Sequence, residues 1–160
     1  MPSAHARHET PMERADRNFT ELLQELRVTQ TGVQILFAFL LTLAFTQRFA
    51  ELDDFARATY VTTLVFALSA TALFTAPAAL HRVLFQRGAK RLIVVVSSRL
   101  AAAGLVMLAL SFTGALLLVV DVVLGRTAGI VAGSGAFLLC LALWGVLPRV
   151  LRGRVGSRHR

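Results

Sequence analysis

The sequence has few of the residues on which soluble enzymes and disulfide-stabilised domains depend. A single cysteine, Cys140, excludes an intramolecular disulfide, and charged residues make up only 16% of the 160 residues. Hydrophobic residues make up 56%, and the mean hydropathy of +0.65 is too high for a soluble domain of this length. We therefore expect an all-α integral membrane protein formed by one small unit.

Catalytic and metal-binding patterns are also absent from the sequence. The four histidines lie near the ends of the chain or beside an apolar segment, the serines have no paired base, and no phosphate-binding loop occurs. We expect a protein that is not an enzyme and that uses no catalytic residue, metal ion or cofactor.

Four apolar segments approach or reach the roughly 20 residues that cross about 30 Å of hydrocarbon. Charged residues bound each of them on both sides. The predicted spans cover about residues 28–47, 59–80, 98–121 and 127–147. We expect a four-helix bundle over residues 10–148, preceded by a disordered tail at residues 1–9 and followed by a basic cytoplasmic tail at residues 149–160.

The basic residues are distributed as membrane flanks. With four spans, 14 of the 17 Lys and Arg residues fall on the side of the termini, and 3 fall on the other side. The positive-inside rule therefore predicts a multi-pass protein of the inner membrane with both termini in the cytoplasm. The net charge of +8 does not predict nucleic-acid binding, because no stacking aromatic residues are interleaved with the basic ones.

The first helix passes from a charged amphipathic segment into an apolar one without a break. Thr10-Pro-Met-Glu13 is typical of a helix start, and the apolar residues after it recur at three- and four-residue steps. We expect one long helix, half in the cytosol and half in lipid. Its cytosolic half carries an apolar stripe that needs a cover, either a partner protein, the loop at residues 83–85 or the lipid headgroups. This stripe consists of Phe19, Leu22, Leu23 and Leu26.

A polar stripe follows the same helix into the apolar segment. Its residues fall within a narrow arc at about 100° per residue. They are Gln24, Arg27, Thr31 and Gln34. Because lipid would leave the amides without hydrogen-bond partners, we expect this stripe to face other helices. Interhelical hydrogen bonding is the role that we favour, and one wall of a polar cavity is the alternative.

Charged residues near the inner membrane surface form two further candidate groups. Arg99, at the inner edge of the third span, has Glu21 and Glu25 as its natural counter-ions. The loop between the second and third spans contains basic residues and no acid, which predicts contact with anionic lipid headgroups at the cytoplasmic face. Its basic residues include Arg82, Arg87, Lys90 and Arg91.

Small residues mark one face of the fourth span. Gly125, Gly129 and Gly133 are four residues apart, a spacing that lets two helix backbones approach closely. We favour packing inside the same bundle over homodimerisation.

The segment Glu-Leu-Leu-Gln-Glu-Leu-Arg-Val-Thr-Gln-Thr-Gly-Val-Gln at residues 21–34 is the most specific part of a longer pattern. That pattern also includes Ala76-Pro77, His81-Arg82 and Gly104. Over about residues 17–147 the chain resembles an uncharacterised bacterial family of small four-span membrane proteins, a domain of unknown function. The resemblance implies the fold and the membrane location, and it brings no substrate, cofactor or catalytic residue.

These patterns predict a non-enzymatic membrane protein with an interaction or accessory role. Its cytosolic helix and basic inner loop would bind a protein partner or anionic lipid. The alternative is an oligomeric small channel or transporter component, in which the polar stripe of the first helix lines the path.

Overall fold

The computed structural model describes residues 11–84 and 90–151, and nearly all of this part of the chain is helical. No strand occurs in it, which confirms the all-α prediction. The helices are α1 (Pro11–Leu43), the short α2 (Gln47–Ala50), α3 (Asp54–Leu84), α4 (Lys90–Leu124) and α5 (Arg126–Cys140), which continues through the π-helical segment η2 (Leu141–Val146) to Leu151.

Four of these helices are long and apolar enough to cross a membrane. Their apolar segments cover Thr20–Leu43, Asp54–Leu80, Val94–Leu124 and Arg126–Leu151. The four predicted spans fall on these same helices, and each helix extends beyond its predicted span at one end or both. The charged flanks mark the apolar limit of each segment, whereas the helical hydrogen bonds continue past it.

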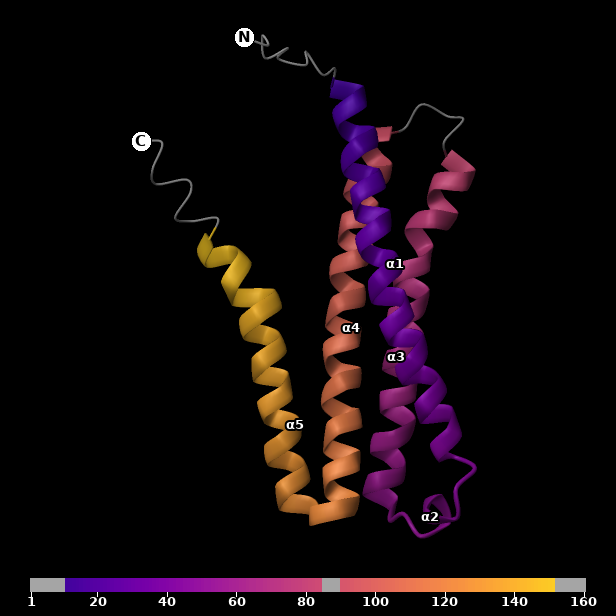
Figure 1. The fold of residues 1–160 in the computed structure, drawn as a ribbon, viewed down its shortest axis with the longest axis vertical. Coiled ribbons are helices and arrows are strands. Elements are labelled where there is room, and N and C mark those ends of the chain that lie inside the picture. Colours follow the sequence, from indigo (N-terminus) through magenta and orange to yellow (C-terminus); the bar gives the residue numbers. More distant parts are fainter. Residues whose placement is uncertain (1–10, 85–89, 152–160) are drawn as a thin grey trace, which may run out of the picture.

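The first helix begins at Pro11, at the predicted helix start, and runs without a break to Leu43. It ends before the predicted limit at residue 47, because residues 44–46 form a turn. The Phe45 N–H donates to the Thr42 carbonyl at 3.1 Å, and the Thr46 hydroxyl donates to the Leu43 carbonyl at 2.8 Å. This turn leads into α2, which lies across one end of the bundle (Figure 1). We call this the α2 end.

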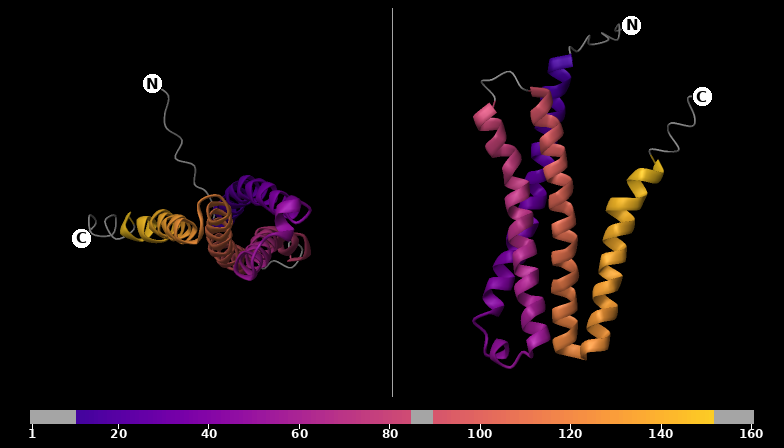
Figure 2. Two further views of the ribbon diagram at one scale, coloured as in Figure 1. Left: turned by 90° about the horizontal axis from the view of Figure 1, so that it is seen from below. Right: turned by 180° about the vertical axis from the view of Figure 1, so that it is seen from behind.

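Helices α1, α3 and α4 pack together. The large contact that α5 makes with another of the four long helices is with α4. Figure 2 shows that α5 stands outside the group formed by the other three helices. It touches α4 near the α2 end and diverges from it toward the end at which α1 begins (Figure 1). The architecture is therefore a three-helix bundle with a fourth helix on one side.

The core of the three-helix bundle is built from one face of α1. Leu26, Val33 and Leu40 are seven residues apart and are buried against α3 and α4. Small residues on the facing helices let the backbones approach, and a Cβ atom at Gly104 would lie 2.6 Å from Cε1 of the buried Phe74 ring.

Polar contacts inside the bundle fix its register. The Tyr60 hydroxyl donates to the Leu40 carbonyl at 2.9 Å, and the Ser111 hydroxyl donates to the Thr63 carbonyl at 3.3 Å. The Tyr60 ring also meets Phe49 of α2 edge to face, with 4.8 Å between ring centroids. Tyr60 therefore joins α1, α2 and α3 at the α2 end.

Candidate functional site

An ionic cluster joins three helices at the α2 end. Arg126, the first residue of α5, donates from Nε to both carboxylate oxygens of Asp121 at 3.1 Å. Its Nη2 donates to Oδ2 of Asp53 at 2.6 Å, and its guanidinium lies 3.9 Å from the centroid of the Phe55 ring. The Asp121 side chain is only 8% exposed, so the cluster pairs a carboxylate that is largely removed from water.

The turn between α4 and α5 explains how Arg126 reaches this position. Gly125 has a φ of 91°, in the left-handed region that favours glycine, and its N–H donates to the Asp121 carbonyl at 2.8 Å. The chain therefore reverses direction within one residue. The predicted packing role of Gly125 is wrong, because nothing lies within 4 Å of a Cβ atom built at this position.

Asp53 caps the start of α3 as well as pairing with Arg126. Its Oδ1 accepts a hydrogen bond from the Ala56 N–H at 2.8 Å, as a helix-capping residue does. This backbone hydrogen bond and the Arg126 guanidinium both lower the pKa of the Asp53 carboxyl below its ordinary value. The carboxylate therefore stays charged in mildly acidic solution.

The lowered pKa of Asp53 sets the sign of a pH effect. Its carboxylate stabilises the folded state above the unfolded pKa of about 3.9, and this stabilisation is lost as the pH falls through the lower folded pKa. We compare Asp53→Asn with the unmodified chain, because asparagine keeps the helix cap and removes the charge. The thermal midpoint of the unmodified chain should be the higher one near neutral pH.

This difference in midpoint should shrink below about pH 4 as the carboxylate is protonated. Thermal unfolding in detergent at a series of pH values measures it. A difference that stays constant or grows in acid would contradict the assignment.

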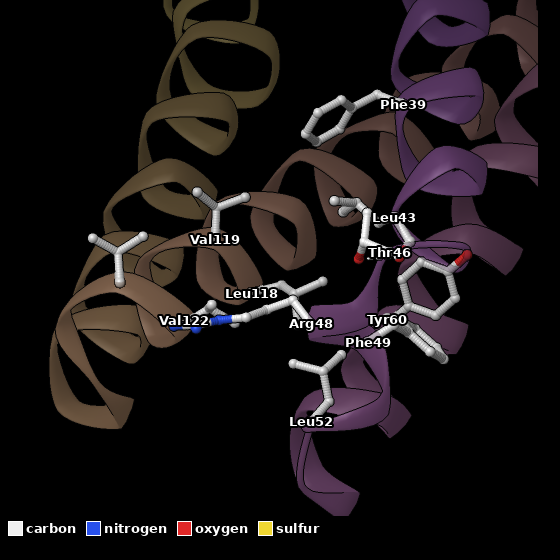
Figure 3. A pocket seen from close by; sticks show the side chains of 11 residues that line it. Phe39, Leu43, Thr46, Arg48, Phe49, Leu52, Tyr60, Leu118, Val119 and Val122 are labelled. Carbon is white, nitrogen blue, oxygen red and sulfur yellow. Dashed lines mark hydrogen bonds between the residues drawn. The ribbon is translucent and has the colours of Figure 1, made fainter.

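A recess lies beside the ionic cluster, and it has an apolar half and a charged half. The apolar half is a cavity of about 230 Å³ between α1, α2 and α4, with Phe39 and Leu43 on one wall and Val119 and Val122 on the other (Figure 3). The charged half is a hollow of about 310 Å³ that includes Asp53, Asp121 and Arg126. Three residues, Arg48, Leu52 and Val122, line both halves.

A second cavity lies between α4 and α5, in the half where the two helices diverge. It has a volume of about 300 Å³ and is lined by small, aliphatic and aromatic residues, including Ala102, Leu105 and Phe137. Trp144 borders it, with its ring centroid 6.5 Å from that of Phe112 on α4. Arg149 lies at its margin and donates to the Gly145 carbonyl at 2.7 Å.

The polar stripe of α1 does not face other helices of this chain, so the expected interhelical hydrogen bonding does not occur inside the bundle. All four of its residues, Gln24, Arg27, Thr31 and Gln34, are exposed. The face of Leu26, Val33 and Leu40 packs inward instead, because large apolar side chains fill the space between helices. Thr31 satisfies its hydroxyl within its own helix by donating to the Arg27 carbonyl at 3.1 Å.

The apolar stripe at the start of α1 is partly covered within the chain. Leu26 is buried, and the half-buried Leu22 packs against the same cluster, which includes Phe74 of α3 and Ala101 of α4. Two of the four stripe residues therefore need no partner protein. The Phe19 side chain lies outside the described part of the structure.

The structure does not bring the predicted inner-face ion pairs together. Glu21 lies 3.7 Å from Nε of Arg17 on its own helix. Among the described side chains no ion pair joins Arg99 to Glu21 or Glu25, and all three side chains are exposed. Since Leu22 and Leu26 occupy the face of α1 that meets the other helices, the two glutamates face away from the bundle.

The predicted lipid-binding loop falls mostly outside the described residues. Arg82 is exposed near the end of α3. Arg87 lies outside the described part of the chain, and so do the side chains of Lys90 and Arg91 at the start of α4.

Gly129 and Gly133 lie where α5 crosses α4. Both are buried, and a Cβ atom at Gly129 would lie 2.8 Å from the Leu117 carbonyl oxygen. At Gly133 the corresponding atom would lie 2.9 Å from Cβ of Leu117. These two glycines therefore act in packing within the chain, the role favoured by their spacing.

The ionic cluster is the feature of the candidate site that the sequence patterns missed. Asp53 and Arg126 are 73 residues apart, and no local sequence pattern links them. The sequence did contain one signal. Basic residues are scarce on the side of the α2 end, so an arginine there opposes the positive-inside rule and is expected to have a local ionic partner. Within the described residues, no group of three or more His, Cys, Asp or Glu side chains is arranged to hold a metal ion.

Comparison with known proteins places the chain in a family. No curated protein and no solved structure matches it. One family model matches residues 8–148, which is most of the chain and includes all four apolar helices. This match confirms the resemblance to an uncharacterised family. The chain therefore belongs to the family of unknown function DUF6328.

Proposed function

We propose that this chain is a non-enzymatic, multi-pass protein of the inner membrane that acts by binding another membrane protein through α5. The orientation with cytoplasmic termini is supported by the distribution of basic residues, of which 14 of 17 fall on that side. The four long apolar helices support the membrane location.

The observation that carries this proposal is the isolation of α5. Only 6% of its apolar window is buried in the chain, compared with 28% for α3 and 22% for α4. Its buried residues are Gly129 and Gly133, both in the half that touches α4. The other half carries several exposed large apolar side chains, including Leu138 and Leu139, which are 61% and 60% exposed.

The cavity between α4 and α5 favours a protein helix as the occupant. Helices associate in lipid mainly by close packing, and small residues at the contact allow it. Ala102 and Ala109 on α4 and Gly145 beyond α5 supply such residues along this cavity. Phe137 and Trp144 add aromatic surface, which is common at the centres of protein interfaces.

The basic inner loop supports a second contact, with anionic lipid headgroups. Arg82 is exposed at the end of α3, on the side assigned to the cytoplasm. Each basic residue near an anionic membrane surface contributes about 1 kcal/mol of attraction. This contact would hold the bundle at the cytoplasmic leaflet and leave α5 available to its partner.

Purification from native membranes tests the proposal. A tagged full-length chain should retain a specific membrane protein, and Leu141→Trp should release it, because Leu141 lines the cavity between α4 and α5 and is 48% exposed. Val61→Trp, at a residue of α3 that is 51% exposed, is the matched control and should retain the partner. Retention by both variants, or the absence of any partner above a tag-only background, would contradict the proposal.

An oligomeric channel or transporter component is the second candidate, and the exposed polar stripe of α1 favours it. Gln34 lies within the apolar segment of α1, and within the described residues no hydrogen bond satisfies its amide. A neighbouring copy would supply one, since an amide both donates and accepts hydrogen bonds. Oligomer mass and ion flux in liposomes test this candidate. A monomer that passes no common ion would exclude it.

A further inference from the structure

We propose that the recess at the α2 end binds one phospholipid whose headgroup carries a phosphate and a primary ammonium. One acyl chain of this lipid lies in the apolar cavity between α1, α2 and α4. This site is separate from the exposed face of α5, so the test of lipid binding does not depend on whether the proposed function is correct.

The position of the cavity fits the upper part of an acyl chain. Its walls come from the last turns of α1 and α4, whose apolar segments end at Leu43 and Leu124. This is the depth at which headgroups give way to hydrocarbon. Side chains such as Phe39 and Val119 line it almost entirely with carbon (Figure 3). A volume of about 230 Å³ holds several methylene groups but not a complete lipid.

Arg48 supplies the contact for the phosphate. It lines both the apolar cavity and the charged hollow, and Figure 3 shows its side chain extending from α2 toward Val122 on α4. The side chain is 70% exposed, and its ion pair with Glu51 is long, at 3.8 Å. Such a pair is weak, so the guanidinium retains donors for a phosphate oxygen.

The remaining charges select a headgroup that also carries a positive group. Arg126 already pairs with Asp121 and Asp53, and Arg48 has a long pair with Glu51 at 3.8 Å. The two arginines and three carboxylates give the hollow a formal excess of one negative charge. With the phosphate on Arg48, a primary ammonium on the same headgroup donates hydrogen bonds to these carboxylates, which a quaternary ammonium does not do.

Labelling with photoactivatable lipids tests the site on the full-length chain in nanodiscs. The probes carry a diazirine on one acyl chain and have phosphoethanolamine, phosphocholine or phosphoglycerol headgroups. We expect the phosphoethanolamine probe to label residues 39–48 and 118–123 about tenfold more than the other two, the ratio given by about 1.4 kcal/mol of selectivity. Unlabelled phosphatidylethanolamine should displace it from the unmodified chain, and phosphatidylcholine should not.

Two variants locate the site. Val122→Trp should fill the cavity and reduce labelling about tenfold, whereas Val131→Trp, at an α5 residue that is 68% exposed, should not change it. Arg48→Gln should remove the preference among headgroups, and Arg82→Gln near the opposite end should keep it. Equal labelling by the three probes, a preference for phosphoglycerol, or labelling that Val122→Trp leaves unchanged would overturn the proposal.

Discussion

Gly129→Leu is expected to separate α5 from α4 and to lower the free energy of unfolding by about 3 kcal/mol. The Cβ atom of the new side chain would lie 2.8 Å from the Leu117 carbonyl oxygen and 2.9 Å from the Asp121 backbone nitrogen. These are backbone atoms of a long helix, so only a displacement of α5 relieves the overlap. Unfolding in mixed detergent micelles, followed by circular dichroism, measures the effect.

Gly135→Leu is the matched control for this prediction. Gly135 lies on the same helix, and nothing lies within 4 Å of a Cβ atom built there. The same substitution should therefore cause no loss of stability, and the higher helix propensity of leucine should raise the stability by up to about 0.8 kcal/mol. Equal losses at the two glycines would show that the α4–α5 contact is not the cause.

Gly104→Ala is expected to lower the free energy of unfolding by about 2 kcal/mol. Its Cβ atom would lie 2.6 Å from Cε1 of Phe74, and that ring is 1% exposed and surrounded by core side chains. Gly32→Ala should have the opposite sign, a gain of about 0.5 to 1 kcal/mol, because alanine favours a helix and nothing lies within 4 Å of that position. The same micelle unfolding experiment measures both variants.

A double variant separates this overlap from a general effect of the substitution. Phe74→Leu removes part of the ring that a Cβ atom at Gly104 would strike, so Phe74→Leu with Gly104→Ala should lose less stability than the two single losses combined. Simple addition of the two losses would show that the ring and the glycine do not interact in this way.

The sequence patterns predicted the helices well because their signals are local. Apolar length, flanking charge and the start at Pro11 are properties of contiguous residues, and they agree with α1, α3, α4 and α5. The position of α5 outside the three-helix bundle was not predictable in this way. Lipid-facing and helix-facing surfaces are equally apolar, so composition does not distinguish the isolated α5 from the packed α3.

The candidate sites were harder to predict because they depend on which face of a helix packs inward. An amide in lipid has no hydrogen-bond partner, and this cost predicts that the stripe that includes Gln34 faces other helices. In the structure the face of Val33 packs inside the chain instead. Likewise, the contact between Asp53 and Arg126 requires the turn at Gly125 and the crossing of α5 over α4. Long-range geometry of this kind has no local sequence signal.

Photo-crosslinking in intact cells tests the central claim most directly, namely that α5 binds another membrane protein. A diazirine amino acid replaces Leu141, which lines the cavity between α4 and α5, or, as a control, the similarly exposed Val61 of α3. The proposed function predicts one discrete protein adduct at position 141 and none at position 61. An adduct of two copies of this chain would favour the oligomeric alternative, and lipid adducts alone at both positions would contradict a protein-binding role for α5.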